Sequence, residues 1–135
     1  MLRGESIVDD KDLVRVAMEA REQAYAPYSK YRVGAALLTR SGRVYTGANV
    51  ENASYGLSVC AERVAAFKAV SEGDREFEAI AVATGNGVLP CGACRQVLAE
   101  FGPDMRIIVA DADGNTRTYR LSDLLPGRFT QADLE

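Results

Sequence analysis

The fold and the chemistry of this chain depend on two short segments, Cys60-Ala61-Glu62 and Pro90-Cys91-Gly92-Ala93-Cys94. They hold all three cysteines of the 135-residue sequence, which contains no histidine. A structural zinc site is usually closed by four protein ligands, whereas a catalytic site uses three and keeps one position open. The cysteine pattern therefore predicts a catalytic zinc site, one Zn²⁺ per chain, with Cys60, Cys91 and Cys94 as its ligands.

Glu62 stands at the position where zinc enzymes with this pattern carry a catalytic glutamate. Zinc deaminases carry a metal ligand, a glutamate two positions later that does not bind the metal, and a downstream Pro-Cys-x-x-Cys. The chain matches each part. A lone Cys-x-x-Cys is weak evidence because redox proteins also have it, whereas the two-part spacing is much more specific. Glu62 is therefore predicted to be the catalytic acid and base that moves protons between water and substrate.

Two other interpretations of the cysteines stay open. A structural zinc site needs a fourth ligand, and without histidine it would have to recruit a carboxylate such as Glu62. A redox dithiol at Cys91 and Cys94 is the second alternative, since an intracellular Cys-x-x-Cys at a helix start is a known redox arrangement. Neither alternative explains the Cys60-Ala61-Glu62 segment.

Length and composition indicate a single globular domain over residues 1–135. The hydrophobic fraction of 47% is ordinary for such a protein, and the longest apolar runs, such as 33–38, are far too short to cross a membrane. Acidic residues stand in segment 1–11 where a signal peptide would be apolar. We therefore expect no membrane partner and a cytoplasmic protein with reduced cysteines.

The charge of the chain narrows the class of partner. A net charge of −3 and a pI near 5.1 disfavour nucleic acids, whose binding depends on many contacts to phosphate. A small and uncharged substrate fits better. Because a chain of this length closes a deep pocket with difficulty, help from a second subunit is expected.

The hydrophobic pattern alternates between strand and helix periods. It predicts a mixed sheet of five strands in an α/β three-layer sandwich, with helices on both faces. An amphipathic helix begins near Leu13 and stops before Pro27, and two further helices cover 60–71 and 91–101. The strands are expected at 32–39, 43–49, 78–83, 105–110 and 116–121. The cysteines then lie at helix N-termini, whose partial positive charge favours thiolates.

The sequence resembles a known family over nearly its whole length. The resemblance rests on residues 25–29, 33–36, 47–52, 60–63, 90–96 and 124–127. These segments are similar to those of the small homotetrameric class of cytidine deaminases. The resemblance implies hydrolysis of cytidine and deoxycytidine to uridine and deoxyuridine with release of ammonia, a role in pyrimidine salvage, and a homotetramer whose sites are completed by neighbouring subunits.

The resemblance also assigns substrate-binding residues. It implies that Asn49 and Glu51 bind the sugar, and that Tyr31, where most members have phenylalanine, packs against the pyrimidine. From the pattern alone, Asn49 could equally end a strand, Glu51 could be solvated, and Tyr31 could belong to the core.

Three more positions near the substrate follow from the same resemblance. The backbone N–H of Ala61 is expected to meet the base oxygen, and the carbonyl of Leu89 to accept from the amino group. Phe129 is expected to reach the site of a neighbouring subunit. By composition alone, Phe129 is a tail residue that packs on its own domain.

Arg63 is predicted to compensate charge at the metal. Three thiolates bring −3 to a +2 ion, and the remaining −1 weakens zinc as a Lewis acid. Guanidinium donors can hydrogen-bond thiolate sulfurs and offset this charge. The alternative is a solvated helix arginine. Among functions, the alternatives to a nucleoside deaminase are a deaminase of another aminopyrimidine compound, such as a cytosine-containing antibiotic, and a zinc or redox module without turnover.

Overall fold

A five-stranded sheet organises the described part of the chain. The computed structural model describes residues 8–134; residues 1–7, part of the segment that argued against a signal peptide, and residue 135 lie outside the described residues. The strand order is β2-β1-β3-β4-β5. The strands are β1 (Gly34–Thr39), β2 (Val44–Ala48), β3 (Phe77–Ala83), β4 (Arg106–Ala110) and β5 (Thr116–Arg120).

The sheet is mixed, as the sequence predicts. β3 and β4 run parallel, and the other three neighbouring pairs are antiparallel. A parallel pair needs a long crossover, which α3 (Gly92–Phe101) provides. β1 and β2 form a hairpin, closed by Gly42 at a φ of 89° that glycine adopts without strain.

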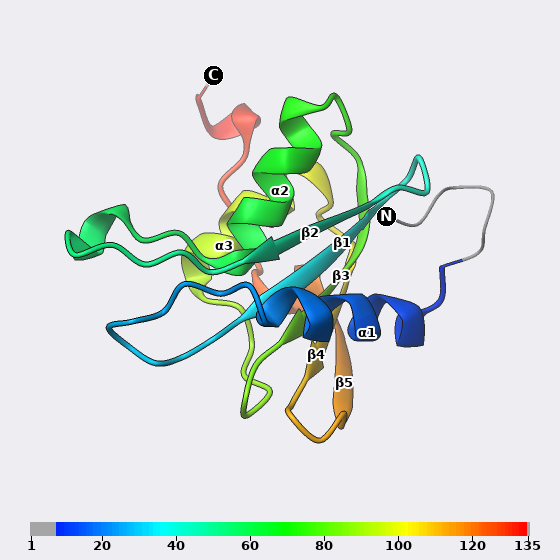
Figure 1. Ribbon diagram of the computed structural model, residues 1–135. Coiled ribbons are helices and arrows are strands. Elements are labelled where there is room, and N and C mark those ends of the chain that lie inside the picture. The colour runs from blue at the N-terminus through cyan, green and yellow to red at the C-terminus, as the bar shows by residue number, and fades with distance from the viewer. Residues whose placement is uncertain (1–7, 135) are drawn as a thin grey trace.

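Helices cover both faces of the sheet (Figure 1). α1 (Asp10–Arg21) packs on one face, and α2 (Ala61–Ser71) and α3 pack on the other. The described residues also form α4 (Leu121–Leu124) and two 3₁₀ turns, η1 (Tyr55–Leu57) and η2 (Gln131–Leu134). The predicted three-layer α/β sandwich is confirmed. No helix within residues 8–134 combines the length and apolar character that crossing a membrane requires.

Side chains along each strand point alternately to the two faces of the sheet, and the two resulting cores differ in the size of their residues. Ala36 and Leu38 face α1, whereas Ala35 and Leu37 face α2 and α3. On the α1 side β3 contributes only alanines, so the helix can lie close to the sheet. On the other side larger residues fill the space: Ile80, Val82, Ile107, Val109 and Leu98.

Gly47 brings the start of α2 close to the sheet. A Cβ at this position would stand 2.3 Å from the carbonyl oxygen of Ala61 and 2.7 Å from the amide nitrogen of Ala65. Real Cβ contacts are never this short, so only glycine fits. The glycine in β2 therefore sets the position of the first turn of α2, which follows Cys60.

The structure shifts several predicted boundaries. Cys60 and Cys91 precede their helices as N-cap residues with extended backbone, rather than occupying the first helical turn. The first helix begins at Asp10 and ends at Arg21, several residues before Pro27. The strand expected to end at Leu121 ends one residue earlier, because Leu121 begins α4 and buries its side chain.

Two long loops project from one end of the sheet. They cover residues 22–33 and 49–60 and lie near one another in Figure 1. Backbone hydrogen bonds connect them, from the amide of Tyr25 to Asn49 and from the amide of Glu51 to Tyr25. We call these two loops the aromatic arm, because they carry the exposed side chains of Tyr25, Tyr28, Tyr31 and Tyr55.

Candidate metal centre

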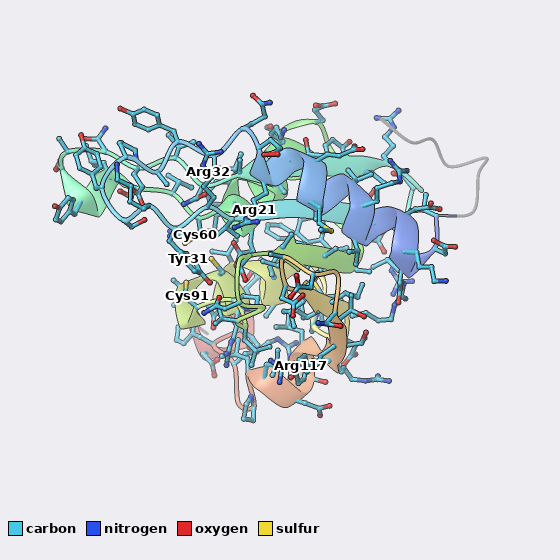
Figure 2. All side chains as sticks on the ribbon, turned by 60° about the horizontal axis from the view of Figure 1, so that its bottom comes forward. Arg21, Tyr31, Arg32, Cys60, Cys91 and Arg117 are labelled. Carbon is cyan, nitrogen blue, oxygen red and sulfur yellow. The ribbon has the colours of Figure 1, made fainter. Side chains whose placement is uncertain are left out.

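The three cysteines meet between the starts of α2 and α3. Their Sγ atoms all lie within 4.8 Å of one another, and those of Cys91 and Cys94 are 3.4 Å apart. Cys60 and Cys91 lie in the same region of Figure 2. Cys94 is fully buried, Cys60 is partly buried and Cys91 is exposed, so the group is open on one side. The predicted gathering of the cysteines is confirmed.

Local structure explains why the two motifs meet. Val50 and Val59 exchange both backbone hydrogen bonds, which folds loop 49–60 back so that Cys60 lies beside the end of β2. β3 is central in the sheet and leads through residues 84–90 to Cys91. Contact between α2 and α3 then holds the two helix starts together.

Neighbouring thiols shift the pKa of Cys60 and of Cys94, and as thiolates the three cysteines need a cation between them. The Cys60 thiolate accepts a hydrogen bond from Cys94 and another from Arg63, and these lower the pKa of Cys60 to about 5. The same contact with Cys60, together with burial, raises the pKa of Cys94. Three thiolates so close would repel one another unless a positive ion lay between them. Soft thiolate donors in this number match Zn²⁺, so one zinc ion per chain fits the centre.

Glu62 lies beside the cysteines without joining them. Its side chain is 5% exposed in the first turn of α2. Burial raises the pKa of Glu62 to about 7, and the nearby Cys60 thiolate adds to this effect. Among the described residues, the ligand group contains the three cysteines and not this carboxylate. That geometry disfavours the structural-zinc interpretation, in which Glu62 is the fourth ligand.

Arg63 contacts the sulfur of Cys60. Its Nη2 atom donates to Cys60 Sγ at 3.3 Å, and this hydrogen bond raises the pKa of Arg63. Its Nε atom is buried without a hydrogen-bond partner among the described residues. Arg63 is therefore not a solvated helix arginine, and its charge lies next to the Cys60 thiolate, as its position in the sequence predicts.

Asn49 and Glu51 bind the backbone of the aromatic arm. Asn49 accepts from the amide of Val33 at 2.9 Å and donates to the carbonyl of Tyr31 at 2.9 Å. Glu51 accepts from the amides of Tyr28 at 3.0 Å and Ser29 at 3.1 Å, and from the hydroxyl of Ser29. These contacts lower the pKa of Glu51, the Ser29 hydroxyl most of all. Neither residue is merely a turn former or a solvated side chain.

The remaining expected site residues differ in their burial and in their distance along the chain from the cysteines. Ala61 is fully buried at the first position of α2, directly after Cys60, and Leu89 is half-buried two residues before Cys91. Phe129 is 56% exposed, and its carbonyl accepts from Gln96 of α3 at 2.9 Å. Phe129 therefore does not pack into the core of its own chain.

Asn86, which the sequence does not predict as a site residue, contacts Tyr31. The hydroxyl of Tyr31 donates to its Oδ1 atom at 2.7 Å, although the two residues lie 55 positions apart. Tyr31 is 38% exposed, so it is not a core residue. The only signal in the sequence is an asparagine within a glycine-rich loop that ends at a cysteine motif.

The fold and the centre define an α/β protein with a zinc site made of thiolates beside a buried carboxyl group. The family model described as the cytidine and deoxycytidylate deaminase zinc-binding region matches residues 7–110. The chain belongs to this family.

Individual relatives agree with the family model. A cytidine deaminase of Halalkalibacterium halodurans is 52% identical over 130 residues, which cover 94% of this chain and 98% of that one. The crystal structure of a Burkholderia pseudomallei cytidine deaminase aligns with a TM-score of 0.87 at 48% identity, covering 90% of this chain and 100% of that one. A blasticidin-S deaminase of Bacillus cereus is 29% identical over 132 residues, 90% of this chain and 93% of that one.

Proposed function

We propose that this protein catalyses the zinc-dependent hydrolysis of cytidine and deoxycytidine to uridine and deoxyuridine, releasing ammonia for pyrimidine salvage. One observation carries the proposal: the buried carboxyl group of Glu62 lies near the Cys60 thiolate, and it does not belong to the group of three thiols. A closed structural site or a redox dithiol has no use for such a group. The high identity to proteins named cytidine deaminase supports the same substrate.

Cys60, Cys91 and Cys94 would hold the zinc ion. When bound, zinc supplies a Lewis acid that makes water a nucleophile near neutral pH. Glu62 would accept a proton from water as the hydroxide adds to C4 of the base, and would give this proton to N3. It would then take the proton of the new C4 hydroxyl and pass it to the amino group, which leaves as ammonia when the C4–N bond breaks. Because Glu62 is almost fully buried, its proton is shielded from exchange with bulk water during these steps. Arg63 offsets the negative charge of the thiolates through Cys60.

Backbone and side-chain groups orient the nucleoside. The N–H of Ala61 meets the base oxygen and the carbonyl of Leu89 accepts from the amino group, while the ring of Tyr31 packs on the base. Asn49 and Glu51 bind the sugar hydroxyls. Their existing contacts leave room for this, since two carboxylate oxygens offer about four acceptor positions and the amide of Asn49 can make one more bond from each end.

The decisive experiment measures ammonia released from cytidine by the purified zinc protein. Glu62→Gln should keep zinc and lose about 10²- to 10⁴-fold in kcat, because it removes a proton carrier and no ligand. Glu72→Gln, at the exposed C-terminal end of the same helix, is the matched control and should keep full activity. Loss of zinc from Glu62→Gln would mean that Glu62 is a ligand.

Blasticidin S is the substrate to compare, because one relative is named for it. Asn49 and Glu51 lie together within the aromatic arm, and hydroxyl groups of a sugar suit such acceptors. We therefore expect a higher kcat/KM for cytidine than for the antibiotic. The opposite order would replace the nucleoside with another aminopyrimidine.

We also propose a homotetramer whose sites are completed by neighbouring subunits. The aromatic arm exposes Tyr25, Tyr28, Val50, Tyr55 and Leu57 beside the open side of the centre, and such a surface on a soluble chain marks an interface. Phe129 is exposed and free to reach a neighbour. Light scattering coupled to size-exclusion chromatography should give four chains, and Tyr55→Glu should lower the number. A monomer with full activity would contradict this.

The remaining proposals concern the setting of the enzyme. Thiol ligands must stay reduced to bind zinc, which supports a cytoplasmic location. One sheet with both faces covered supports a single domain over residues 1–135. The net charge of −3 supports a free nucleoside, rather than a nucleic acid or a membrane surface, as the partner.

A further inference from the structure

Two separate segments approach each other beside the metal centre. One is the aromatic arm with Tyr31, and the other is loop 84–89, which runs from β3 towards Cys91. The Tyr31 hydroxyl and Asn86 Oδ1, 2.7 Å apart, join them. Figure 2 shows Tyr31 in the same region as Cys60 and Cys91. This hydrogen bond therefore links the arm to the loop that leads to Cys91.

Tyr31 is connected to the Cys60 side. Asn49 binds the backbone of Tyr31 and of Val33 through both ends of its amide. The next residue, Val50, is paired through its backbone with Val59, which precedes Cys60. The backbone of Tyr31 is thus held relative to the start of α2. Its ring extends from that backbone with its hydroxyl on Asn86.

Loop 84–89 is held on its own side. The buried hydroxyl of Thr84 accepts from the amides of Gly87 at 2.7 Å and Val88 at 3.3 Å. Arg117 donates to the carbonyl of Gly87 at 3.4 Å, and the amide of Ala112 donates to the carbonyl of Gly85 at 3.4 Å. The loop is therefore a fixed support, and Asn86 presents its side chain from it to Tyr31.

We propose that Asn86 is a positioning residue for the pyrimidine ring. By accepting the hydrogen bond from Tyr31, Asn86 fixes the ring of Tyr31 relative to the loop that carries Leu89. It thereby sets the distance between the Tyr31 ring and that loop, and the pyrimidine is proposed to bind between the two. We call this space the gap. This rests on the proposed function, because the gap has this meaning only for a nucleoside substrate. Nothing in the spacing of the motifs assigns a role to Asn86.

The hydrogen bond should act on binding rather than on the chemical step. The Tyr31 ring packs against the base equally before and during proton transfer, so its position contributes uniform binding. Uniform binding changes KM and leaves kcat in place. A neutral hydrogen bond of this kind is worth about a fivefold change in affinity.

The experiment is a double-mutant cycle on the zinc-loaded enzyme with cytidine. Tyr31→Phe and Asn86→Ala should each raise KM about fivefold, with kcat within twofold of wild type. The double variant should be no worse than either single variant, because both remove the same bond. Asn86 is not among the described residues with positive φ, so alanine brings no backbone strain there.

Two further variants complete the design. Asn86→Asp keeps an oxygen acceptor for the Tyr31 hydroxyl and should restore a KM near that of wild type. Arg21 lies near Gly85 and Arg117 donates to the carbonyl of Gly87, so we expect these two positive charges to offset the added negative charge. Tyr119→Phe removes a hydroxyl that makes no hydrogen bond among the described residues, and should leave KM unchanged.

The outcomes separate this proposal from the proposed function. Additive effects, an unchanged KM in both single variants, or a loss confined to kcat would overturn the positioning role while leaving the deaminase intact. A loss of zinc or a large drop in Tm in Asn86→Ala would assign the residue to folding and overturn it equally. If the wild-type protein releases no ammonia from cytidine, the proposed function fails first, and the positioning role with it.

Discussion

The metal centre and the aromatic arm lie next to each other and are built in opposite ways. At the centre, Cys94 is fully buried and Glu62 nearly so, and only glycine fits at position 47. In the arm, Tyr55 is 75% exposed, and nothing lies within 4 Å of where a Cβ of Gly56 would be. The three predicted zinc ligands thus come from one chain, whereas the arm leaves aromatic side chains uncovered. In the proposed tetramer, a neighbouring subunit would cover them.

Removal of a buried ligand should have the largest effect. Cys94→Ala deletes a fully buried donor, so zinc should be lost and activity should fall below detection. Metal analysis of the purified variant checks the zinc content. Ala93→Ser, at the exposed neighbouring position, is the control and should keep both zinc and activity. A zinc-loaded and active Cys94→Ala would show that the centre does not depend on the three thiols.

Glycine substitutions compare the two regions directly. Gly47→Ala forces a Cβ into the backbone of α2 and should cost about 3 kcal/mol of unfolding free energy. Gly56→Ala in η1 meets open space at an ordinary φ and should change stability by less than about 0.5 kcal/mol. Denaturant unfolding measures both. A large loss for Gly56→Ala would mean that another chain covers the arm in solution.

Charge compensation at the centre should have an intermediate effect. Arg63→Gln should lower kcat about tenfold with zinc retained, because the thiolates then weaken the metal as a Lewis acid. Adding Cys60→His replaces a thiolate with a neutral ligand and should restore part of the loss. Kinetics of the four proteins give the coupling between the two positions. Strictly additive effects would show that Arg63 acts through packing or a subunit contact.

The smallest expected effect concerns the charge of the substrate beside the arm. Cytidine 5′-monophosphate should react with a kcat/KM about fivefold lower than cytidine, because a phosphate near the Glu51 carboxylate is repelled by about 1 kcal/mol in water. Competition between the two substrates in one assay measures the ratio. Equal efficiency would place the 5′ position of the sugar away from Glu51.

The sequence predicts the centre better than the arm. Spacing alone predicts the ligands, and the hydrophobic period predicts the layers and the helices that present them. The orientation of Glu62 relative to Cys60 was harder to predict. Two positions on an ideal helix separate side chains by about 200° around the axis, which would point Glu62 away from the metal. The structure resolves this because Cys60 is an extended N-cap residue, so ideal helix geometry does not apply between the two.

Contacts between distant segments lie beyond such patterns. The bond from Tyr31 to Asn86 and those from Glu51 to Ser29 join residues 55 and 22 positions apart. Neither helix nor strand periodicity carries information about them. The start of α4 at Leu121 was missed for a related reason, since its side chain is buried by tertiary packing and not by a local signal.

The contacts of Glu51 offer a way to measure substrate binding in the arm through two backbone amides. The same carboxylate that should meet the sugar already holds the amides of Tyr28 and Ser29. A sugar hydroxyl that binds this carboxylate, as proposed, should weaken the hydrogen bonds from those two amides. Hydrogen–deuterium exchange at Tyr28 and Ser29 should then record sugar binding in the backbone itself, independently of any turnover at the metal.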